Sequence, residues 1–351
     1  MDEATWRGRQ DDRAVEGGIA VTRWPVTRFR RPRLFHQATR IFFHLPPSIR
    51  PERAWLRAQG PYAPSLIRAL EASASVPTLF GPYLYHPIVY GLPRARGPRI
   101  LMPAAHDEPA LHLHAVRTEV GESSALWYNT PEERDLVERV HPIAERKPSA
   151  IGAVGVDTAR GGDASRFRAR FGIEGQVLLY AGRATEGKGY PELRAGFAEL
   201  VRRGSDSTLA VVGPQSEQDA AGVRHVGVLD SPGLRDAIAA SAAVVVPGKL
   251  ESLSMIALEA WAAGRPTLLN GESPVLRGQA ERAGGQLLFT DSRSFADAAA
   301  RILEDPDLAR RLGAAGNAYV REHHQWDDVV ARLQHLLALI AEAYESGHVP
   351  D

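Results

Sequence analysis

Short apolar runs alternate with amphipathic segments throughout the second half of the chain, as at 177–180 and 208–212. Such runs are typical of parallel strands buried on both faces, and the periodic segments between them are typical of covering helices. This alternation predicts an α/β domain in which ligands bind beyond the carboxyl ends of the strands. The predicted strands are 177–180, 208–212, 242–246, 267–269 and 286–289, and the predicted helices are 191–203, 232–241, one after Ser252, 274–282 and 292–303.

The first 150 residues show the same alternation of strands and helices less clearly. Thr130-Pro131-Glu132-Glu133 reads as a capping box, which predicts a helix that reaches Val140. The strand candidates here are 19–24, 78–80, 100–102, 125–128 and 150–154.

The stretch 156–175, rich in Gly, Asp and Arg, is typical of a linker between two domains. We therefore expect a first Rossmann-like domain at 1–155 and a second at 156–325. The remaining segment, 326–351, contains an apolar stripe of helical period, so we expect a helix that packs back on the first domain.

The composition is that of an ordinary globular protein and excludes several kinds of site. The 42 Lys and Arg balance the 42 Asp and Glu, so no global field recruits nucleic acid. No cysteine is present, which excludes disulfides, thiolate metal sites and cysteine nucleophiles. The acidic start, Met1-Asp2-Glu3, is not that of a signal peptide, and no apolar run approaches the roughly 20 residues of a membrane span. We expect a cytoplasmic protein.

One basic segment leaves two interpretations open. Arg28, Arg30, Arg31 and Arg33 precede a partly amphipathic stretch at 34–45. The first interpretation is a solvated loop followed by a surface helix. The second is a peripheral contact with an anionic membrane, at its inner face.

The segment after the strand at 242–246 combines an apolar helix with acidic residues. Ser252 is the predicted N-cap, and Gly264 ends the helix. Because the helix is apolar on nearly every side, we expect it to be buried. Glu259 nevertheless lies in its interior, and Glu251 precedes it with seven residues between the two. An unpaired buried carboxylate is costly, so a partner must satisfy Glu259, and a hydroxyl-rich ligand is one candidate.

A second loop, after the strand at 177–180, carries two cations. It contains Gly182-Arg183 and, after four intervening residues, Lys188-Gly189. Alone, these cations are a weak signal, because isolated Arg and Lys in a loop are usually surface charges. Together with the free amides of Leu253 and Ser254 at the next helix start, they form a cradle for an anion. Cations suit a diphosphate and carboxylates suit sugar hydroxyls, so the combination predicts a nucleotide-diphosphate sugar as the ligand.

These residues resemble a known family. Gly182-Arg183, Lys188-Gly189, Gly213, the Glu251/Glu259 pair and Gly264-Arg265-Pro266 look like the donor domain of the retaining GT-B glycosyltransferases of family four, over about residues 150–345. The resemblance implies two Rossmann-like domains that face a cleft. It also implies that Arg183 and Lys188 bind the donor diphosphate, Glu251 the transferred sugar and Glu259 the ribose. The turn at 227–229 would lie against the nucleobase.

The first domain resembles the same family more loosely. His106, after the strand at 100–102, matches a histidine that in the family lies between donor sugar and acceptor; its alternative reading is a structural histidine. Asp107 and Glu108 are expected to cap the next helix. His112 and His114 form a His-x-His pair, but the resemblance implies no metal ion and no cofactor besides the sugar nucleotide.

One departure from the family concerns the beginning of the chain. Family members open with a strand, a glycine-rich loop and a helix, and nothing of that kind precedes Ile19. The segment from Thr5 to Val26 resembles the part of the family that comes after the second strand. We therefore expect a first domain that is incomplete and shortened at its N-terminus.

Two functions are consistent with these observations. The first is transfer of a hexosyl group, with retained anomeric configuration, to the hydroxyl of an acceptor that is a glycan, a lipid or a small molecule. The alternative is a catalytically impaired protein that binds the nucleotide sugar, or a subunit of a transferase complex. His106 and Glu251 are the catalytic candidates, and Arg183, Lys188, Leu253, Ser254 and Glu259 are the donor-binding candidates.

Overall fold

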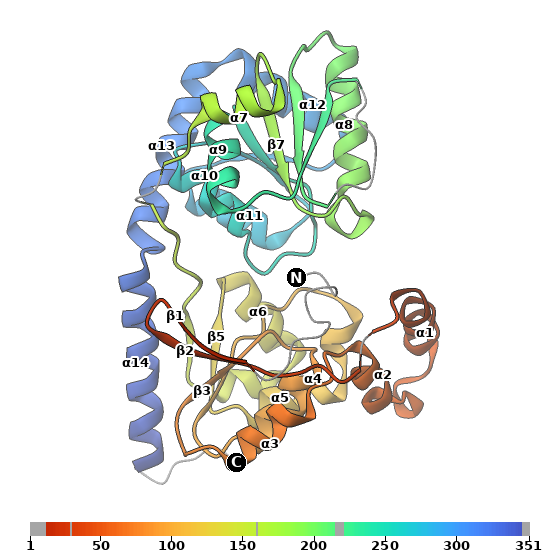
Figure 1. The fold of residues 1–351 in the computed structure, drawn as a ribbon, viewed down its shortest axis with the longest axis vertical. Coiled ribbons are helices and arrows are strands. Elements are labelled where there is room, and N and C mark those ends of the chain that lie inside the picture. Colours follow the sequence, from red (N-terminus) through yellow and green to blue (C-terminus); the bar gives the residue numbers. More distant parts are fainter. Residues whose placement is uncertain (1–11, 29, 159–160, 215–220, 346–351) are drawn as a thin grey trace. The chain divides into compact units, whose positions relative to one another are not determined.

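A computed structural model describes residues 12–28, 30–158, 161–214 and 221–345. The chain divides into two compact units (Figure 1). Unit 1 extends to Gly152 and resumes at Arg332, and unit 2 comprises Ala153–Ala331. The expected boundaries, after 155 and after 325, lie within a few residues of these divisions. Residues 1–11, on which part of the expectation about the chain's beginning rests, lie outside the described residues.

Unit 2 contains one six-stranded sheet with the order β12-β11-β10-β7-β8-β9, and every pair within it is parallel. Counted within the unit, this is the doubly wound order 3-2-1-4-5-6. The order reverses between β7 and β10, so the loops after these two strands flank the topological switch point. The strands are β7 Val177–Ala181, β8 Thr208–Val212, β9 Val223–Gly227, β10 Ala243–Val246, β11 Thr267–Asn270 and β12 Leu287–Phe289.

Helices cover both faces of this sheet because its strand residues alternate between two buried clusters. Leu178 packs with Phe197 and Phe295 on one face, and Leu179 packs with Phe167 and Ile238 on the other. The predicted strands and helices of this unit are confirmed to within about two residues at most ends. The linker expected at 156–175 is wrong in part, because a helix at Ala164–Phe171 packs on the sheet through Phe167. The helices are α7 Ala164–Phe171, α8 Tyr190–Arg202, α9 Ser231–Ala240, α10 Met255–Ala262, α11 Pro274–Arg282, α12 Ser292–Glu304 and α13 Pro306–His323, with a 3-10 turn at Glu186–Lys188.

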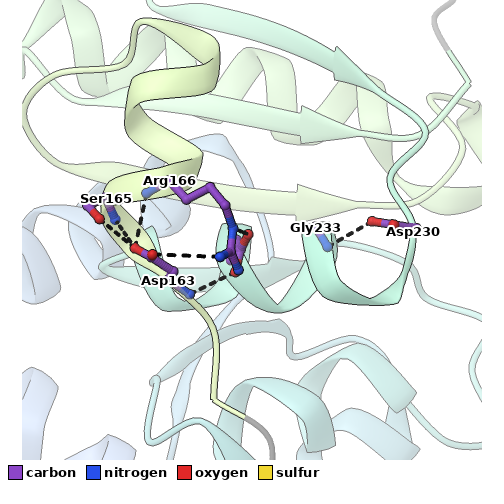
Figure 2. Close-up of polar contacts among 6 residues, drawn as sticks. Asp163, Ser165, Arg166, Asp230 and Gly233 are labelled. Atoms are coloured by element: carbon purple, nitrogen blue, oxygen red, sulfur yellow. Dashed lines mark hydrogen bonds and ion pairs between the residues drawn. The ribbon is translucent and has the colours of Figure 1, made fainter.

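Polar contacts tie α7 to α9 where the chain enters unit 2. The Asp163 carboxylate caps α7 by accepting the amides of Ser165 and Arg166, and Asp230 caps α9 through the amide of Gly233 (Figure 2).

The guanidinium of Arg166 then reaches across to α9, where its Nε and Nη2 lie 2.6 and 2.7 Å from the two carboxylate oxygens of Asp236. Asp236 is buried and also accepts the amide of Asp163 at 2.7 Å. The hydrogen bond from Arg166 is the main reason that the pKa of Asp236 lies below its ordinary value.

Unit 1 contains a four-stranded parallel sheet with the order β3-β4-β5-β6. Its core joins Leu101 and Tyr128 of the sheet to Val116 and Val137 of the covering helices. The strands are β3 Thr78–Phe80, β4 Arg99–Leu101, β5 Ala125–Tyr128 and β6 Ser149–Ile151. The helices are α1 Pro32–His44, α2 Glu52–Gln59, α3 Pro64–Ala72, α4 His86–Gly91, α5 His114–Glu122 and α6 Pro131–Val140, with 3-10 turns at Pro47–Ile49, Leu92–Arg94, Pro109–His112 and Pro142–Arg146.

The strand expected at 19–24 exists, but its placement in a parallel sheet is wrong. β2, Ile19–Arg23, pairs antiparallel with β1, Asp12–Glu16, in a separate two-stranded ribbon. The Gly17-Gly18 turn, with φ of +59° and +82°, allows this tight reversal. Val15 and Ile19 are largely exposed, so the ribbon buries only part of its apolar surface.

The last helix, α14, runs from Trp326 to Glu345 and continues from unit 2 into unit 1. Within unit 1, Arg332 Nη2 donates to the carbonyl of Gly152 at 3.2 Å. Among the described residues, no helix has both the length and the apolar character needed to cross a membrane.

Candidate functional site

The loops after β7 and β10 meet at the switch point of unit 2. Lys188 Nζ, from the first loop, lies 2.8 Å from Glu251 Oε1, from the second. Gly189 has a φ of +68°, and a Cβ built on it would lie 2.3 Å from the carbonyl oxygen of Pro247. Only glycine permits this close approach of the two backbones. The structure therefore brings the predicted cation and the predicted acid together.

Arg183 belongs to the same cluster through its backbone. The Tyr180 hydroxyl donates to the Arg183 carbonyl at 2.8 Å, and Gly182 donates to Val212 at 2.9 Å. The Arg183 side chain is exposed. Burial raises the pKa of Tyr180, the charge of Glu251 raises it further, and the charge of Arg183 lowers it. The phenol thus lies within electrostatic reach of Glu251, a predicted catalytic residue, and of Arg183, a predicted donor-binding residue.

The start of α10 differs from the prediction. The helix begins at Met255, so Ser252 as N-cap is wrong; Ser254 takes that position, without a side-chain capping bond. The Ser254 amide, expected to be free, donates to Gln279 Oε1 at 3.0 Å. Because the first turn of an α-helix leaves its amides unpaired, the helix donors begin at Met255. Donor binding by the Leu253 amide stays a prediction.

Glu259 does not lie in a dry helix interior as expected. The face of α10 that carries it is partly open, since Met255 is 37% exposed and Ile256 is half-buried. Burial raises the pKa of Glu259, and the charge of Arg235 on α9 lowers it. Glu259 is therefore accessible to a ligand, and the argument that a ligand must satisfy a fully buried acid no longer applies.

Sequence reasoning missed three side chains that hold these loops. Besides Tyr180, Asn270 at the end of β11 donates through Nδ2 to the Pro247 carbonyl at 2.8 Å, and Gln279 on α11 anchors Ser254. Asn270 and Gln279 are both buried. Asn270 is a polar residue at the carboxyl end of an apolar strand, which is a detectable signal, whereas a glutamine within a helix gives none.

His106 lies in unit 1, on the loop after β4. Its Nε2 is 3.6 Å from Glu108 Oε1, which accepts the Tyr83 hydroxyl at 2.6 Å. His106 Nδ1 is buried and has no hydrogen-bond partner among the described residues. Glu108 occupies the N-cap position of the 3-10 turn Pro109–His112, as expected, but its side chain makes no capping bond. At the start of α5 the amides of His114 and Ala115 are instead accepted by Glu52.

The same loop is held by a buried carboxylate. Glu133 on α6 is fully buried and accepts the amide of Ala105 through Oε1 and that of Asn129 through Oε2, each at 2.6 Å. The Thr130 hydroxyl accepts the Glu133 amide at 3.2 Å, as the capping box predicts. Burial raises the pKa of Glu133 to about 7, although the surrounding backbone amides lower it.

The His-x-His pair does not form a metal site in the part of the chain that the structure describes. His112 Nε2 lies 3.8 Å from Asp107 Oδ1, and no group of three or more potential ligands gathers around them or elsewhere in the described ranges. That the reaction needs no metal ion stays a prediction.

A doubly wound parallel sheet defines a Rossmann-like α/β domain, a class in which ligands bind at the edge where these switch-point loops lie. Residues 175–305 match the family model described as glycosyl transferases group 1. The match lies within unit 2, so this unit carries a domain of the glycosyl transferases group 1 type. The prediction of the family is confirmed.

Individual proteins agree with this assignment. D-inositol 3-phosphate glycosyltransferase from Frankia alni is 32% identical over 237 residues, which cover 60% of this chain and 58% of that protein. The chain thus spans less than two thirds of the length of this relative.

Solved structures share the fold. Sucrose-phosphate synthase from Thermosynechococcus elongatus superposes with a TM-score of 0.70 at 17% identity, covering 96% of this chain and 87% of that one. HepE from Anabaena, in complex with UDP, has a TM-score of 0.62 at 16% identity, covering 80% of this chain and 82% of that one. The predicted α/β fold of GT-B type, with two Rossmann-like domains, is confirmed.

Proposed function

We propose that this protein is a glycosyltransferase that moves a hexosyl group from a nucleotide-diphosphate sugar to an acceptor hydroxyl, with retention of anomeric configuration. The observation that carries the proposal is the contact of Lys188 with Glu251 at the switch point, beside the exposed Arg183. Two cations match the charge of a diphosphate, and a carboxylate beside them accepts hydrogen bonds from sugar hydroxyls.

The chemistry asked of these residues is electrostatic. As the bond from the anomeric carbon to the diphosphate oxygen breaks, negative charge grows on the nucleoside diphosphate, and Lys188, Arg183 and the first amides of α10 stabilise it. The acceptor oxygen forms the new bond to the same carbon, and its proton leaves with the diphosphate. Glu251 orients the sugar, Glu259 the ribose, and His106 a group at the reacting carbon.

Relatives and structural neighbours support this choice of donor class. The Frankia alni relative is named as a glycosyltransferase, and the HepE structures hold UDP or UDP-glucose. UDP-glucose is therefore the first donor to test, within a panel that varies the base and the sugar.

The experiment separates transfer from mere binding. Calorimetry with UDP and with the donor panel measures binding, and donor hydrolysis and transfer to glycan, lipid and small hydroxyl acceptors measure turnover. We expect turnover of at least one donor. Tight binding without turnover by the full chain would instead favour the alternative, a nucleotide-sugar-binding protein or a subunit of a transferase complex.

We propose in addition that α1 contacts an anionic membrane from its inner face. Residues 17–51 contain seven arginines and no acidic residue. Leu34 and Ile41, one heptad apart and so on one side of α1, are 58% and 66% exposed. An adjacent side of α1 packs through Phe42 on Trp55, with ring centroids 5.2 Å apart.

An apolar stripe that faces outward beside basic side chains is the arrangement of a helix that lies in a membrane interface. Co-sedimentation with phosphatidylglycerol vesicles and with phosphatidylcholine vesicles tests this contact. We expect binding to the anionic vesicles only, lost at high salt and in the Leu34→Glu variant. Equal binding to both vesicles, or to neither, contradicts it.

A further inference from the structure

The loop that carries His106 follows β4, and a side chain from α6 holds its backbone. Ala104, within this loop, has a φ of +51°, a left-handed conformation that residues other than glycine rarely adopt. Such a backbone persists only where its surroundings impose it. The next residue, Ala105, is fully buried, and its amide donates to Glu133 Oε1.

Glu133 joins two loops rather than one. Its second oxygen, Oε2, accepts the amide of Asn129, in the loop after β5. β4 and β5 are neighbouring parallel strands, so their following loops lie at one edge of the sheet. A single carboxylate therefore sets the spacing of two loops at the edge where a doubly wound sheet places its ligands.

The requirement for two accepting oxygens explains why this buried group is an acid. A carboxylate accepts both amides, whereas the amide of a glutamine offers one acceptor and turns an NH₂ group toward the other N–H. The groups that the structure places around the Glu133 carboxyl are backbone amides and the phenols of Tyr83 and Tyr128. The amides that lower the pKa of Glu133 are those of Asn129, Ala105, Ala104 and Thr130, all in the two loops and at the start of α6.

We propose that Glu133 is the positioning residue of the His106 loop: by binding the amides of Ala105 and Asn129 it fixes the place of the His106 imidazole. Ala105 is bonded directly to His106 along the chain, so an anchored Ala105 amide leaves the imidazole little freedom. The Tyr83–Glu108 hydrogen bond restrains the same loop from its far side. The link to catalysis rests on the proposed glycosyltransferase function.

The test compares Glu133→Gln, Glu133→Asp and the control Glu138→Gln, which lies on the same helix and is 4.0 Å from Arg134. With UDP-glucose or the best donor of the panel, we expect Glu133→Gln to lower kcat about 10- to 100-fold with the donor KM within about twofold. The control stays near wild type. In a His106→Ala background, Glu133→Gln should then lower kcat little further, because it acts through His106.

Independent effects that multiply in the double variant would overturn the proposal, as would an unchanged kcat in Glu133→Gln. A readout without turnover keeps this separate from the proposed function. Hydrogen exchange at the Ala105 and Asn129 amides should accelerate, and the NMR signals of the His106 ring should shift, in Glu133→Gln but not in Glu138→Gln. If these signals change while no donor is turned over by wild type, the proposed function fails and the positioning role stands. If they do not change, the positioning role fails.

Discussion

Lys188 and Glu251 form an ion pair of 2.8 Å between two loops that are separated by more than 60 positions in the chain. Glu251 is mostly buried in this pair and Lys188 is more open, with side-chain exposures of 16% and 38%. The Glu251 carboxylate thus pairs with Lys188, the cation that we assign to the donor diphosphate. Donor binding must replace or share this contact, which makes the pair a direct test of the site.

Neutralising the acid should separate binding of the nucleotide from transfer of the sugar. In Glu251→Gln, Lys188 loses its counter-charge, so we expect UDP to bind unchanged or up to about fivefold more tightly, the size of a partly exposed ion pair. Turnover should fall about 10- to 100-fold because the sugar loses a charged partner. Calorimetry with UDP and donor-turnover assays measure the two effects, and weaker UDP binding would contradict the assignment.

Removing the cation should weaken every nucleoside diphosphate. We expect Lys188→Ala to reduce the affinity for UDP and UDP-glucose about 10- to 100-fold, the value of a charge-assisted hydrogen bond. The matched control is Lys249→Ala, since Lys249 lies in the adjacent loop but pairs with Glu272 at 2.5 Å. Equal losses in both variants would mean that general charge, and not the site, attracts the nucleotide.

The contact between the two loops depends on one glycine. In Gly189→Ala, the new Cβ would lie 2.3 Å from the Pro247 carbonyl oxygen, in a left-handed conformation. We expect the loops to separate and donor affinity to fall at least about tenfold. Gly187→Ala, two residues earlier with no atom within 4 Å of its Cβ, is the control and should bind normally. Calorimetry compares the two, and normal binding by Gly189→Ala would show that loop spacing is unimportant.

Much of unit 2 could be predicted from sequence because its sheet is buried on both faces. Strands such as β8 read as continuous apolar runs, and Pro274 and Arg282 bound α11 where expected. The ribbon of β1 and β2 was only half predicted. The charged and apolar side chains of residues 12–16 do not alternate as they would in a strand packed on a core, so this strand was not predicted. Gly17-Gly18 between two short runs was nevertheless a usable hairpin signal.

The part of the site that follows from strand order, the meeting of the loops after β7 and β10, could be predicted from the sequence. Loops after strands that flank a switch point must share one edge, which is why Lys188 and Glu251 could be paired across the chain. The anchors could not be foreseen. Gln279 reaches Ser254 from another helix, and Glu133 reaches the Ala105 amide from 28 positions away, and neither contact leaves a periodic pattern.

Glu259 should contribute equally to the binding of UDP and of UDP-glucose. We assign it to the ribose, which both ligands contain, and it lies on the partly open face of α10. We therefore expect Glu259→Gln to weaken both ligands by about 5- to 50-fold. Calorimetry with the two ligands measures this. A loss confined to UDP-glucose would assign Glu259 to the sugar instead.

The contact between α7 and α9 should make part of the stability of unit 2 dependent on pH. The hydrogen bond from Arg166 holds the pKa of Asp236 below its ordinary value of about 4. A group whose pKa is lower in the folded state than in the unfolded state binds protons more weakly when folded. Its stabilisation is therefore complete above the unfolded pKa and is lost as pH falls through the folded one.

We expect Asp236→Asn to lower the Tm at pH 7 by roughly 2–4 °C, the shift typical of losing one such contact in a domain of this size. Below about pH 4 the difference from wild type should shrink, because protonation already removes the charge of Asp236 in wild type. Thermal unfolding between pH 3 and 7 measures both effects. Asp297→Asn, at an exposed ion pair with Arg203, is the control and should leave Tm nearly unchanged. A Tm difference for Asp236→Asn that is constant with pH would mean that packing, and not the ionised carboxylate, joins the two helices.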